Sequence, residues 1–210
     1  METIYSLLKT TRPINVILAL LSSVISLFSY NFLSISNITC IYYHPTLLYG
    51  FLVIIFYTAA ANTINDLYDI ESDKINHPNR PLASNSISKK NVIIFLFLLI
   101  ILGLLCSLKI NKNAFYFANL LILPLIAIYT PYLKKSPLIG NIVVSIILGS
   151  VFLFTQLLLI NQISDWILFS LAFSLSIIRE LAKDMADING DMQNHIMTFP
   201  CKYGLKKSLS

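Results

Sequence analysis

The segment PTLLYGFLVIIFYTAAANTINDLYDIESD occupies residues 45–73, and its two parts differ sharply in character. Residues 45–65 contain no Asp, Glu, Lys or Arg, whereas four acidic residues fall within the last eight positions. About 20 apolar residues are enough for a helix to cross a membrane. Because Asn65, Asp69 and Asp73 are four residues apart, a helix would stack them on one face. We therefore expect a membrane span that ends in a column of side-chain oxygens.

A second acidic segment, RELAKDMADINGD, occupies residues 179–191 and also follows an apolar stretch. Asp187 and Asp191 repeat the four-residue spacing, and the two acidic segments together hold eight of the ten acidic residues. Only thirteen uncharged residues, 166–178, lead into this segment, too few to cross about 30 Å of hydrocarbon. Its first charged residues therefore lie at membrane depth. Ionisable groups are costly there and normally face a polar cavity.

The composition is that of an integral membrane protein. The chain has 210 residues, is 56% hydrophobic and has a mean hydropathy of +0.74, well above the values of soluble domains. Short connectors, with no linker and no internal repeat, predict one membrane-embedded domain over residues 1–210. The predicted fold class is all-α, a polytopic transmembrane helix bundle with about six spans, at roughly 14–34, 45–65, 91–108, 113–133, 138–161 and 163–184.

The basic residues are distributed very unevenly across the predicted spans. Of the fifteen Lys and Arg residues that give the net charge of +5, thirteen fall on one side and only Lys109 and Lys112 on the other. Such a bias marks the cytoplasmic side of a membrane protein. We therefore expect the N-terminus and both acidic segments at the cytoplasmic face. No basic stripe is interleaved with aromatic residues, so no nucleic-acid partner is expected.

The two acidic segments are predicted to flank one cavity. Clustered carboxylates repel one another unless a cation lies between them, and Mg²⁺ favours a few carboxylates together with substrate phosphates. Basic residues near the same membrane face are candidates for binding a diphosphate: Arg12, Arg80, Lys134 and Lys183. Three tyrosines are candidates for the cavity wall, since an aromatic face stabilises a nearby cation: Tyr68, Tyr129 and Tyr132.

Two long motifs carry a resemblance that covers nearly the whole chain. The first is Asn65-Asp66-x-x-Asp69-x-x-x-Asp73 followed by Asn76-His77-Pro78-Asn79-Arg80-Pro81, and the second is Arg179-Glu180-x-x-Lys183-Asp184-x-x-Asp187-Ile188-x-Gly190-Asp191. In this order they resemble the UbiA superfamily of intramembrane prenyltransferases. The resemblance implies Mg²⁺-dependent transfer of a prenyl group from a polyprenyl diphosphate to an acceptor in the lipid bilayer.

The resemblance also implies roles for individual residues. Asn65, Asp69 and Asp73 would bind one Mg²⁺ ion, and Asp187 and Asp191 would bind a second. The four aspartates of this set would then be catalytic, because the ions they hold neutralise the leaving diphosphate.

Within the superfamily, the motifs are most similar to the geranylgeranylglycerol-phosphate geranylgeranyltransferase branch. That branch implies geranylgeranyl diphosphate as the donor and geranylgeranylglyceryl phosphate as the acceptor. An aromatic quinone precursor is the alternative acceptor. A cation-coupled transporter fits less well, because both acidic segments are predicted at one membrane face instead of the midplane.

Members of the superfamily commonly have about nine helices, whereas this sequence ends at Ser210 after about six predicted spans. We therefore expect the domain to be incomplete at its C-terminus. It would be either a fragment of a longer enzyme or a degenerate copy that binds a prenyl diphosphate without catalysis.

Overall fold

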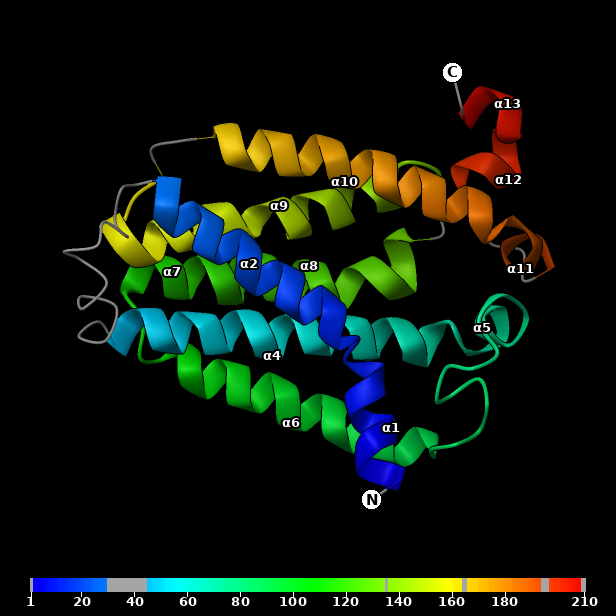
Figure 1. Cartoon of the computed structure of the whole chain (residues 1–210), viewed down its shortest axis with the longest axis horizontal. Helices are drawn as coiled ribbons and strands as arrows, with labels where there is room; N and C mark the ends of the chain where they lie inside the picture. The colour runs from blue at the N-terminus through cyan, green and yellow to red at the C-terminus, as the bar shows by residue number, and fades with distance from the viewer. Residues whose placement is uncertain (1, 30–44, 135, 164–165, 194–196, 209–210) are drawn as a thin grey trace.

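The computed structural model describes residues 2–29, 45–134, 136–163, 166–193 and 197–208. Every regular element within these ranges is helical, which confirms the predicted all-α class. Five long helices form the body of the molecule (Figure 1): α2 (Pro13–Ser29), α4 (Pro45–Tyr68), α6 (Lys89–Ser107), α9 (Ile139–Ile160) and α10 (Ile167–Ala186). α4 packs against α6 and α2, and α9 packs against α10 and α2.

The long helices begin and end close to the predicted boundaries, because charged and polar residues mark the ends of the apolar runs. α4 continues to Tyr68, three residues beyond the predicted span, and α10 begins at Ile167, four residues after the predicted start. The end predicted for the first span at residue 34, and the connector after it, lie outside the described residues.

The predicted span at 113–133 is a single helical segment of mixed type. It consists of α7 (Lys112–Tyr116), the π-helical η1 (Phe117–Ile122), α8 (Leu123–Ile128) and the π-helical η2 (Tyr129–Leu133). The Lys134 N–H, for example, bonds the carbonyl of Tyr129, five residues earlier, at 2.8 Å. Pro124 follows η1 and Pro131 lies within η2. Proline has no N–H for the usual α-helical bond, so the hydrogen-bond register changes beside each proline.

Apart from α7 and α8, the shorter helices lie toward one end of the bundle (Figure 1). They are α1 (Glu2–Thr10), α5 (Ile70–Asn76), α11 (Ile188–Gln193), α12 (Phe199–Tyr203) and α13 (Leu205–Ser208). In Figure 1, α5 and α11 lie beyond the ends of α4 and α10 and pack against each other, and α12 lies beside the end of α10. The two acidic segments therefore reach the same end of the molecule.

Four helical segments are long and apolar enough to cross a membrane: α4, α6, residues 112–133 and α9. α1 and α2 would supply a fifth span if they act together across their 47° bend. α10, the sixth predicted span, carries Arg179, Glu180, Lys183 and Asp184 in its last turns. Large apolar side chains such as Phe97 and Ile101 of α6 are more than half exposed on the outside of the bundle, as suits contact with lipid.

The bend between α1 and α2 is fixed by local contacts. Arg12 has a φ of 50°, a left-handed conformation that costs a non-glycine residue about 1–2 kcal/mol. Asn62 of α4 donates from Nδ2 to the Thr11 carbonyl oxygen at 2.8 Å and so holds the bend against α4. The bend aims the Arg12 guanidinium at the end of α4, where it meets Asp66 at 2.5 Å.

Polar side chains connect the helices inside the bundle. The hydroxyls of Ser23 and Thr155 are 2.7 Å apart between α2 and α9. Tyr57 of α4 donates to Asn119 at 2.5 Å. Gly103 of α6 lies against the Tyr57 ring, and a Cβ there would be 2.3 Å from Tyr57 Cε1. Within a membrane the hydrophobic effect does not drive helices together, because lipid tails are as apolar as the side chains. Membrane helices instead associate through close packing at small residues and through buried hydrogen bonds.

Candidate functional site

The first acidic segment forms the predicted column. The backbone hydrogen bonds of α4 continue through its junction with α5. The Asp69 N–H donates to the Asn65 carbonyl at 2.9 Å, and the Asp73 N–H donates to the Asp69 carbonyl at 2.7 Å. Each residue therefore lies one turn beyond the last. The stacking predicted from the four-residue spacing is confirmed.

The second acidic segment forms a matching column. The Asp187 N–H bonds the Lys183 carbonyl at 2.9 Å, and the Asp191 N–H bonds the Asp187 carbonyl at 3.1 Å. This ladder crosses from α10 into α11, so Lys183, Asp187 and Asp191 follow one another on one helical face.

Direct contacts join the two segments. Ser72 Oγ donates to Asp191 Oδ1 at 3.3 Å, and His77 Nε2 lies 3.2 Å from Asp187 Oδ1. Asn76 donates from Nδ2 to the Asp187 carbonyl at 3.0 Å and accepts at Oδ1 from the Gly190 N–H at 3.2 Å. The prediction that both segments flank one shared pocket is confirmed.

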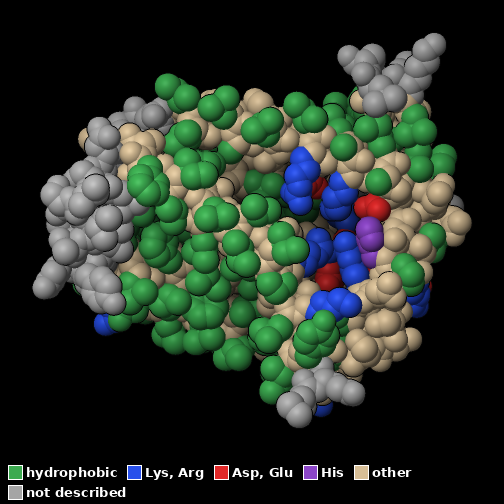
Figure 2. All heavy atoms as spheres, in the orientation of Figure 1, with side chains coloured by type: hydrophobic (Ala, Val, Ile, Leu, Met, Phe, Trp, Pro, Cys, Tyr) green, Lys and Arg blue, Asp and Glu red, His purple; other side chains and the backbone are tan. Residues whose placement is uncertain are grey.

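Between the segments lies a small polar space, termed the acidic pocket. Five aspartates line it: Asp69, Asp73, Asp184, Asp187 and Asp191. Ser72 and three basic residues complete the lining: Arg80, Lys134 and Lys183. Figure 2 shows basic side chains around a hollow on this face, with acidic side chains among them and a histidine beside them.

The basic side chains are paired with individual carboxylates. Lys134 Nζ lies 2.5 Å from Asp69 Oδ2, and Arg80 Nη1 lies 2.5 Å from Asp73 Oδ1. Arg12 does not line the pocket. Its partner Asp66 is 2% exposed and also lies 3.9 Å from Arg80 Nη1, so Arg12 is connected to the pocket through the Asp66 carboxylate.

The pocket environment opposes an uncompensated negative charge. Burial, opposed by Lys134 and aided by the neighbouring carboxylates of Asp184 and Asp187, raises the pKa of Asp191 to about 6. Burial also raises the pKa of Asp73, against the lowering effect of its hydrogen bond and charge interaction with Arg80. A bound cation would relieve this penalty.

The donor set fits Mg²⁺ carried by a diphosphate better than a metal held by protein alone. Within the described ranges, no three His, Cys, Asp or Glu side chains converge closely enough to hold an ion by themselves. Mg²⁺ is commonly bound through one or two carboxylates with substrate phosphates completing its octahedron. Carboxylates and phosphate-binding cations meet here in one pocket, so the residues fit that mode of binding.

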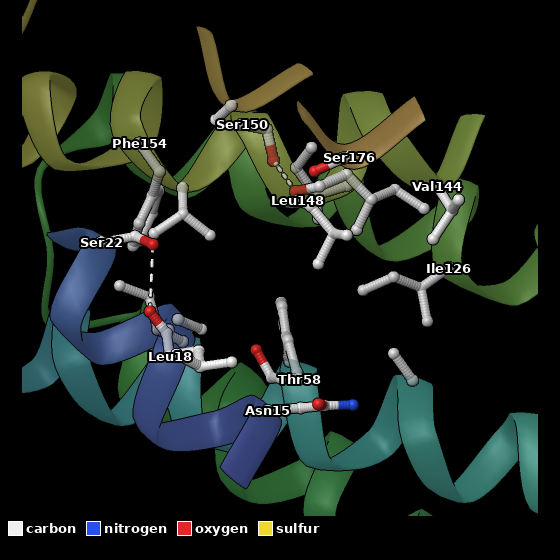
Figure 3. Close-up of a pocket in the computed structure, with 18 of the residues that line it drawn as sticks. Asn15, Leu18, Ser22, Thr58, Ile126, Val144, Leu148, Ser150, Phe154 and Ser176 are labelled. Carbon is white, nitrogen blue, oxygen red and sulfur yellow. Dashed lines mark hydrogen bonds between the residues drawn. The ribbon is translucent and has the colours of Figure 1, made fainter. Parts of the chain in front are cut away.

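A second, larger space lies one helical turn from the acidic pocket along α4 and is termed the apolar cavity (Figure 3). Its volume is about 500 Å³, and it lies among α2, α4, α8, α9 and α10. Asn65 lines this cavity, whereas Asp69, one turn later on α4, lines the acidic pocket. Leu18 and Leu175 line it too and are more than half exposed, so the cavity opens sideways toward lipid between α2 and α10.

The three tyrosines predicted for the cavity wall are placed differently. Tyr129 is buried and lines the apolar cavity. Tyr68 and Tyr132 are 63% and 73% exposed and line neither the cavity nor the acidic pocket. The structure therefore does not place these two tyrosines at the wall of either space. A residue next to Asp69 is turned about 100° away from its column, which is why Tyr68 faces outward.

Residues 35–210 match the model of the UbiA prenyltransferase family. The chain belongs to this family. The resemblance of the two UbiA motifs is thereby confirmed, as is the expectation of an integral membrane protein.

The UbiA relatives include proteins named digeranylgeranylglyceryl phosphate synthase. That of Methanocaldococcus jannaschii is 42% identical over 160 residues, covering 76% of this chain and 56% of that protein. That of Methanococcus aeolicus is 39% identical over 154 residues, covering 73% of this chain and 54% of that protein. The chain thus spans about half the length of these relatives.

Solved UbiA structures share the fold. A structure of digeranylgeranylglyceryl phosphate synthase in membranes has a TM-score of 0.71 at 34% identity, covering 100% of this chain and 72% of that chain. A UbiA homologue from Archaeoglobus fulgidus bound to GPP and Mg²⁺ has a TM-score of 0.77 at 19% identity, covering 97% of this chain and 71% of that chain.

Several residues of the site were not predicted from the sequence. Asp66 and Asn76 belong to the first UbiA motif but lie off its four-residue column. Asn141 of α9 donates to Asp184 at 2.9 Å, and the Thr130 hydroxyl donates to Asn65. The signal for Asp66 and Asn76 was their place within the motif, and Asn141 lies in the Ile139-Gly140-Asn141 stretch, which is also similar to the family; Thr130 is an ordinary residue of an apolar span.

Proposed function

We propose that this chain takes part in Mg²⁺-dependent transfer of a prenyl group from a polyprenyl diphosphate to an acceptor in the membrane. The observation that carries the proposal is the meeting of the acidic pocket with the apolar cavity along α4 and α10. A prenyl diphosphate has the same two parts, a highly charged head and a long apolar tail. The head would lie in the pocket and the tail in the cavity.

Asn65, Asp69 and Asp73 would hold one Mg²⁺ ion, and Asp187 and Asp191 would hold another. The arrangement that supports this assignment is that the four aspartates line the acidic pocket from two facing helical columns, while Asn65 lies one turn before Asp69 at the wall of the apolar cavity. When bound, Mg²⁺ supplies charge stabilisation to a leaving diphosphate. In this proposal Asp69, Asp73, Asp187 and Asp191 are the catalytic residues.

Arg80, Lys134 and Lys183 would bind the diphosphate oxygens directly. Lys134 and Arg80 each contact a column aspartate at 2.5 Å, so they are already within reach of any group held by those carboxylates. Preorganised cations that stabilise charge as it develops are among the largest contributions to catalysis. Arg12 would act less directly, by orienting Asp66 beside Arg80.

The chemistry breaks one bond and forms one. The allylic carbon–oxygen bond of the donor breaks, and its electron pair stays with the diphosphate. The acceptor hydroxyl oxygen forms the new bond to that carbon, and its proton is taken up overall by the diphosphate. Buried Tyr129 lies in the cavity wall, where the aromatic face would stabilise a developing allylic cation.

The donor we propose is geranylgeranyl diphosphate and the acceptor geranylgeranylglyceryl phosphate. Support comes from the relatives at 39% and 42% identity, which are named digeranylgeranylglyceryl phosphate synthases. We also propose that residues 1–210 belong to a single membrane-embedded domain. Its acidic pocket would lie at the cytoplasmic face, as the distribution of Lys and Arg predicts.

The test is turnover by the protein purified in detergent with geranylgeranyl diphosphate, geranylgeranylglyceryl phosphate and Mg²⁺. We expect diphosphate release and an ether product, both lost on adding EDTA and restored by excess Mg²⁺. Turnover only with an aromatic acceptor such as 4-hydroxybenzoate would replace the proposed acceptor. If no acceptor supports turnover while the donor still binds, the protein is a non-catalytic prenyl-diphosphate binder and the proposed reaction is overturned.

A further inference from the structure

One face of α10 runs from the apolar cavity into the acidic pocket. Ala172, Ser176 and Arg179 line the cavity, and Lys183, one turn beyond Arg179, lines the pocket. Spacings of three and four residues place these side chains on one helical face. Arg179 is therefore the last α10 residue of the cavity, at its boundary with the pocket.

Among the described residues that line the apolar cavity, Arg179 is the one that carries a formal charge. Its Nη1 lies 3.0 Å from Oε1 of Glu180, which is buried and also lies 3.6 Å from Lys183 Nζ. Glu180 thus forms ion pairs with both Arg179 and Lys183. A guanidinium has five N–H donors, and the pair with Glu180 leaves donors of Arg179 able to meet a ligand.

We propose that Arg179 binds the anionic group of the acceptor, a phosphate monoester on a lipid. This inference rests on the proposed function and adds a specificity-determining residue to it. The donor diphosphate has its own cations in the acidic pocket, whereas an acceptor that enters sideways from lipid first meets the apolar cavity. Burying an anion there without a partner would be costly.

The position of Arg179 suits a reacting acceptor. The donor carbon that is attacked lies between head and tail, and therefore at the boundary between pocket and cavity. A phosphate held by Arg179 at that boundary brings the acceptor hydroxyl, a few bonds away, to the same place. Planar guanidinium donors match phosphate oxygens in bidentate fashion, and Ser176 lies one turn away on the same face.

The test compares Arg179→Gln and Arg179→Lys with the wild-type protein on two acceptors, geranylgeranylglyceryl phosphate and the uncharged geranylgeranylglycerol. For Arg179→Gln we expect the KM of the phosphate acceptor to rise at least tenfold. The KM values of geranylgeranyl diphosphate and of the uncharged acceptor should change less than twofold. Arg179→Lys should restore part of the loss, because it keeps the charge without the bidentate geometry.

Lys90→Gln is the matched control, because Lys90 is exposed at the start of α6 and its loss removes the same charge far from the cavity. Its KM values should equal those of the wild type. A rise in the donor KM for Arg179→Gln would assign Arg179 to the diphosphate and overturn the proposal. Equal losses with both acceptors would overturn it as well, since they indicate a structural defect.

A binding measurement separates this inference from the proposed function. If the wild-type protein shows no turnover, thermal stabilisation in detergent by geranylgeranylglyceryl phosphate is measured instead. Stabilisation of the wild type that is lost in Arg179→Gln supports the acceptor site even without catalysis. Stabilisation that is equal in both proteins, or absent from both, overturns it.

Discussion

The side chain of Asn76 is hydrogen-bonded to the backbone of Gly190, 114 residues later in the chain, with 3.2 Å between Asn76 Oδ1 and the Gly190 nitrogen. The same side chain donates to the Asp187 carbonyl at 3.0 Å and to Ser72 at 3.4 Å. Glycine is required at the contact, because a Cβ on residue 190 would lie 2.4 Å from Asn76 Nδ2. Asn76 therefore sets the separation of the two acidic segments.

Replacing Asn76 with Ala should weaken metal binding more than folding. It removes three hydrogen bonds, each contributing about 1 kcal/mol net, and frees α11 to shift relative to α5. We expect the Mg²⁺ concentration for half-maximal turnover to rise at least tenfold, as measured by a Mg²⁺ titration. Asn91→Ala, at an exposed position on α6, is the control and should leave the titration unchanged. An unaltered Mg²⁺ requirement in Asn76→Ala would contradict the role given to this residue.

Asp69→Asn and Asp191→Asn should each reduce diphosphate release at least a hundredfold while the bundle stays folded. Each change removes one charge that we propose binds Mg²⁺, and each preserves side-chain volume. Glu71→Gln makes the same chemical change within the first acidic segment, at a side chain that is 69% exposed, and should retain activity within twofold. Circular dichroism and size-exclusion profiles in detergent check folding. Turnover at the wild-type rate in either aspartate variant would rule out its proposed role.

A larger side chain in the apolar cavity should shorten the donor that the protein accepts. Leu148 of α9 lines the cavity and lies within the space drawn in Figure 3. Leu148→Trp should therefore lower turnover with geranylgeranyl diphosphate more than tenfold and with dimethylallyl diphosphate much less. Ile142→Trp adds the same bulk on α9 at a position that is 42% exposed, outside the cavity lining, and should spare both donors. Equal losses with long and short donors would show that the tail does not occupy this cavity.

Gly103→Ala should destabilise the packing of α6 on α4. The new Cβ would lie 2.3 Å from Tyr57 Cε1, and the Tyr57 ring is anchored by its 2.5 Å hydrogen bond to Asn119. Overpacking of this kind costs about 1–3 kcal/mol, so thermal unfolding in detergent should occur several degrees lower. Leu105→Ala, on the outer face of the same helix and 56% exposed, should shift the transition much less. The packing argument fails if the two variants unfold at the same temperature.

The parts of this molecule that follow from helical periodicity could be predicted from the sequence. Asn65, Asp69 and Asp73 are spaced by one turn, so a helix of any orientation must stack them. Helix ends were predictable to within a few residues because polar residues mark the limits of the apolar runs. The meeting of the two segments followed from their common position at one end of the bundle.

Contacts that depend on tertiary geometry could not be predicted in the same way. The pairing of Arg12 with Asp66 depends on a left-handed residue at the bend, which the preceding threonines do not signal. The outward direction of Tyr132 follows from the π-helical register around Pro131. The role of Asn76 is visible only once Gly190 is known to face it.

The contact between Asn76 and Gly190 also has a consequence for biogenesis. A nascent chain that has inserted only as far as α9 already carries the aspartates of α4 and α5. It does not yet contain the second acidic segment, so the acidic pocket cannot form. The contact between Asn76 and Gly190 closes a loop of more than a hundred residues, so it forms later and more slowly than the local helices. Substrate affinity should therefore emerge abruptly, when α10 and α11 arrive, and a ribosome-stalled intermediate ending before residue 187 should bind no prenyl diphosphate.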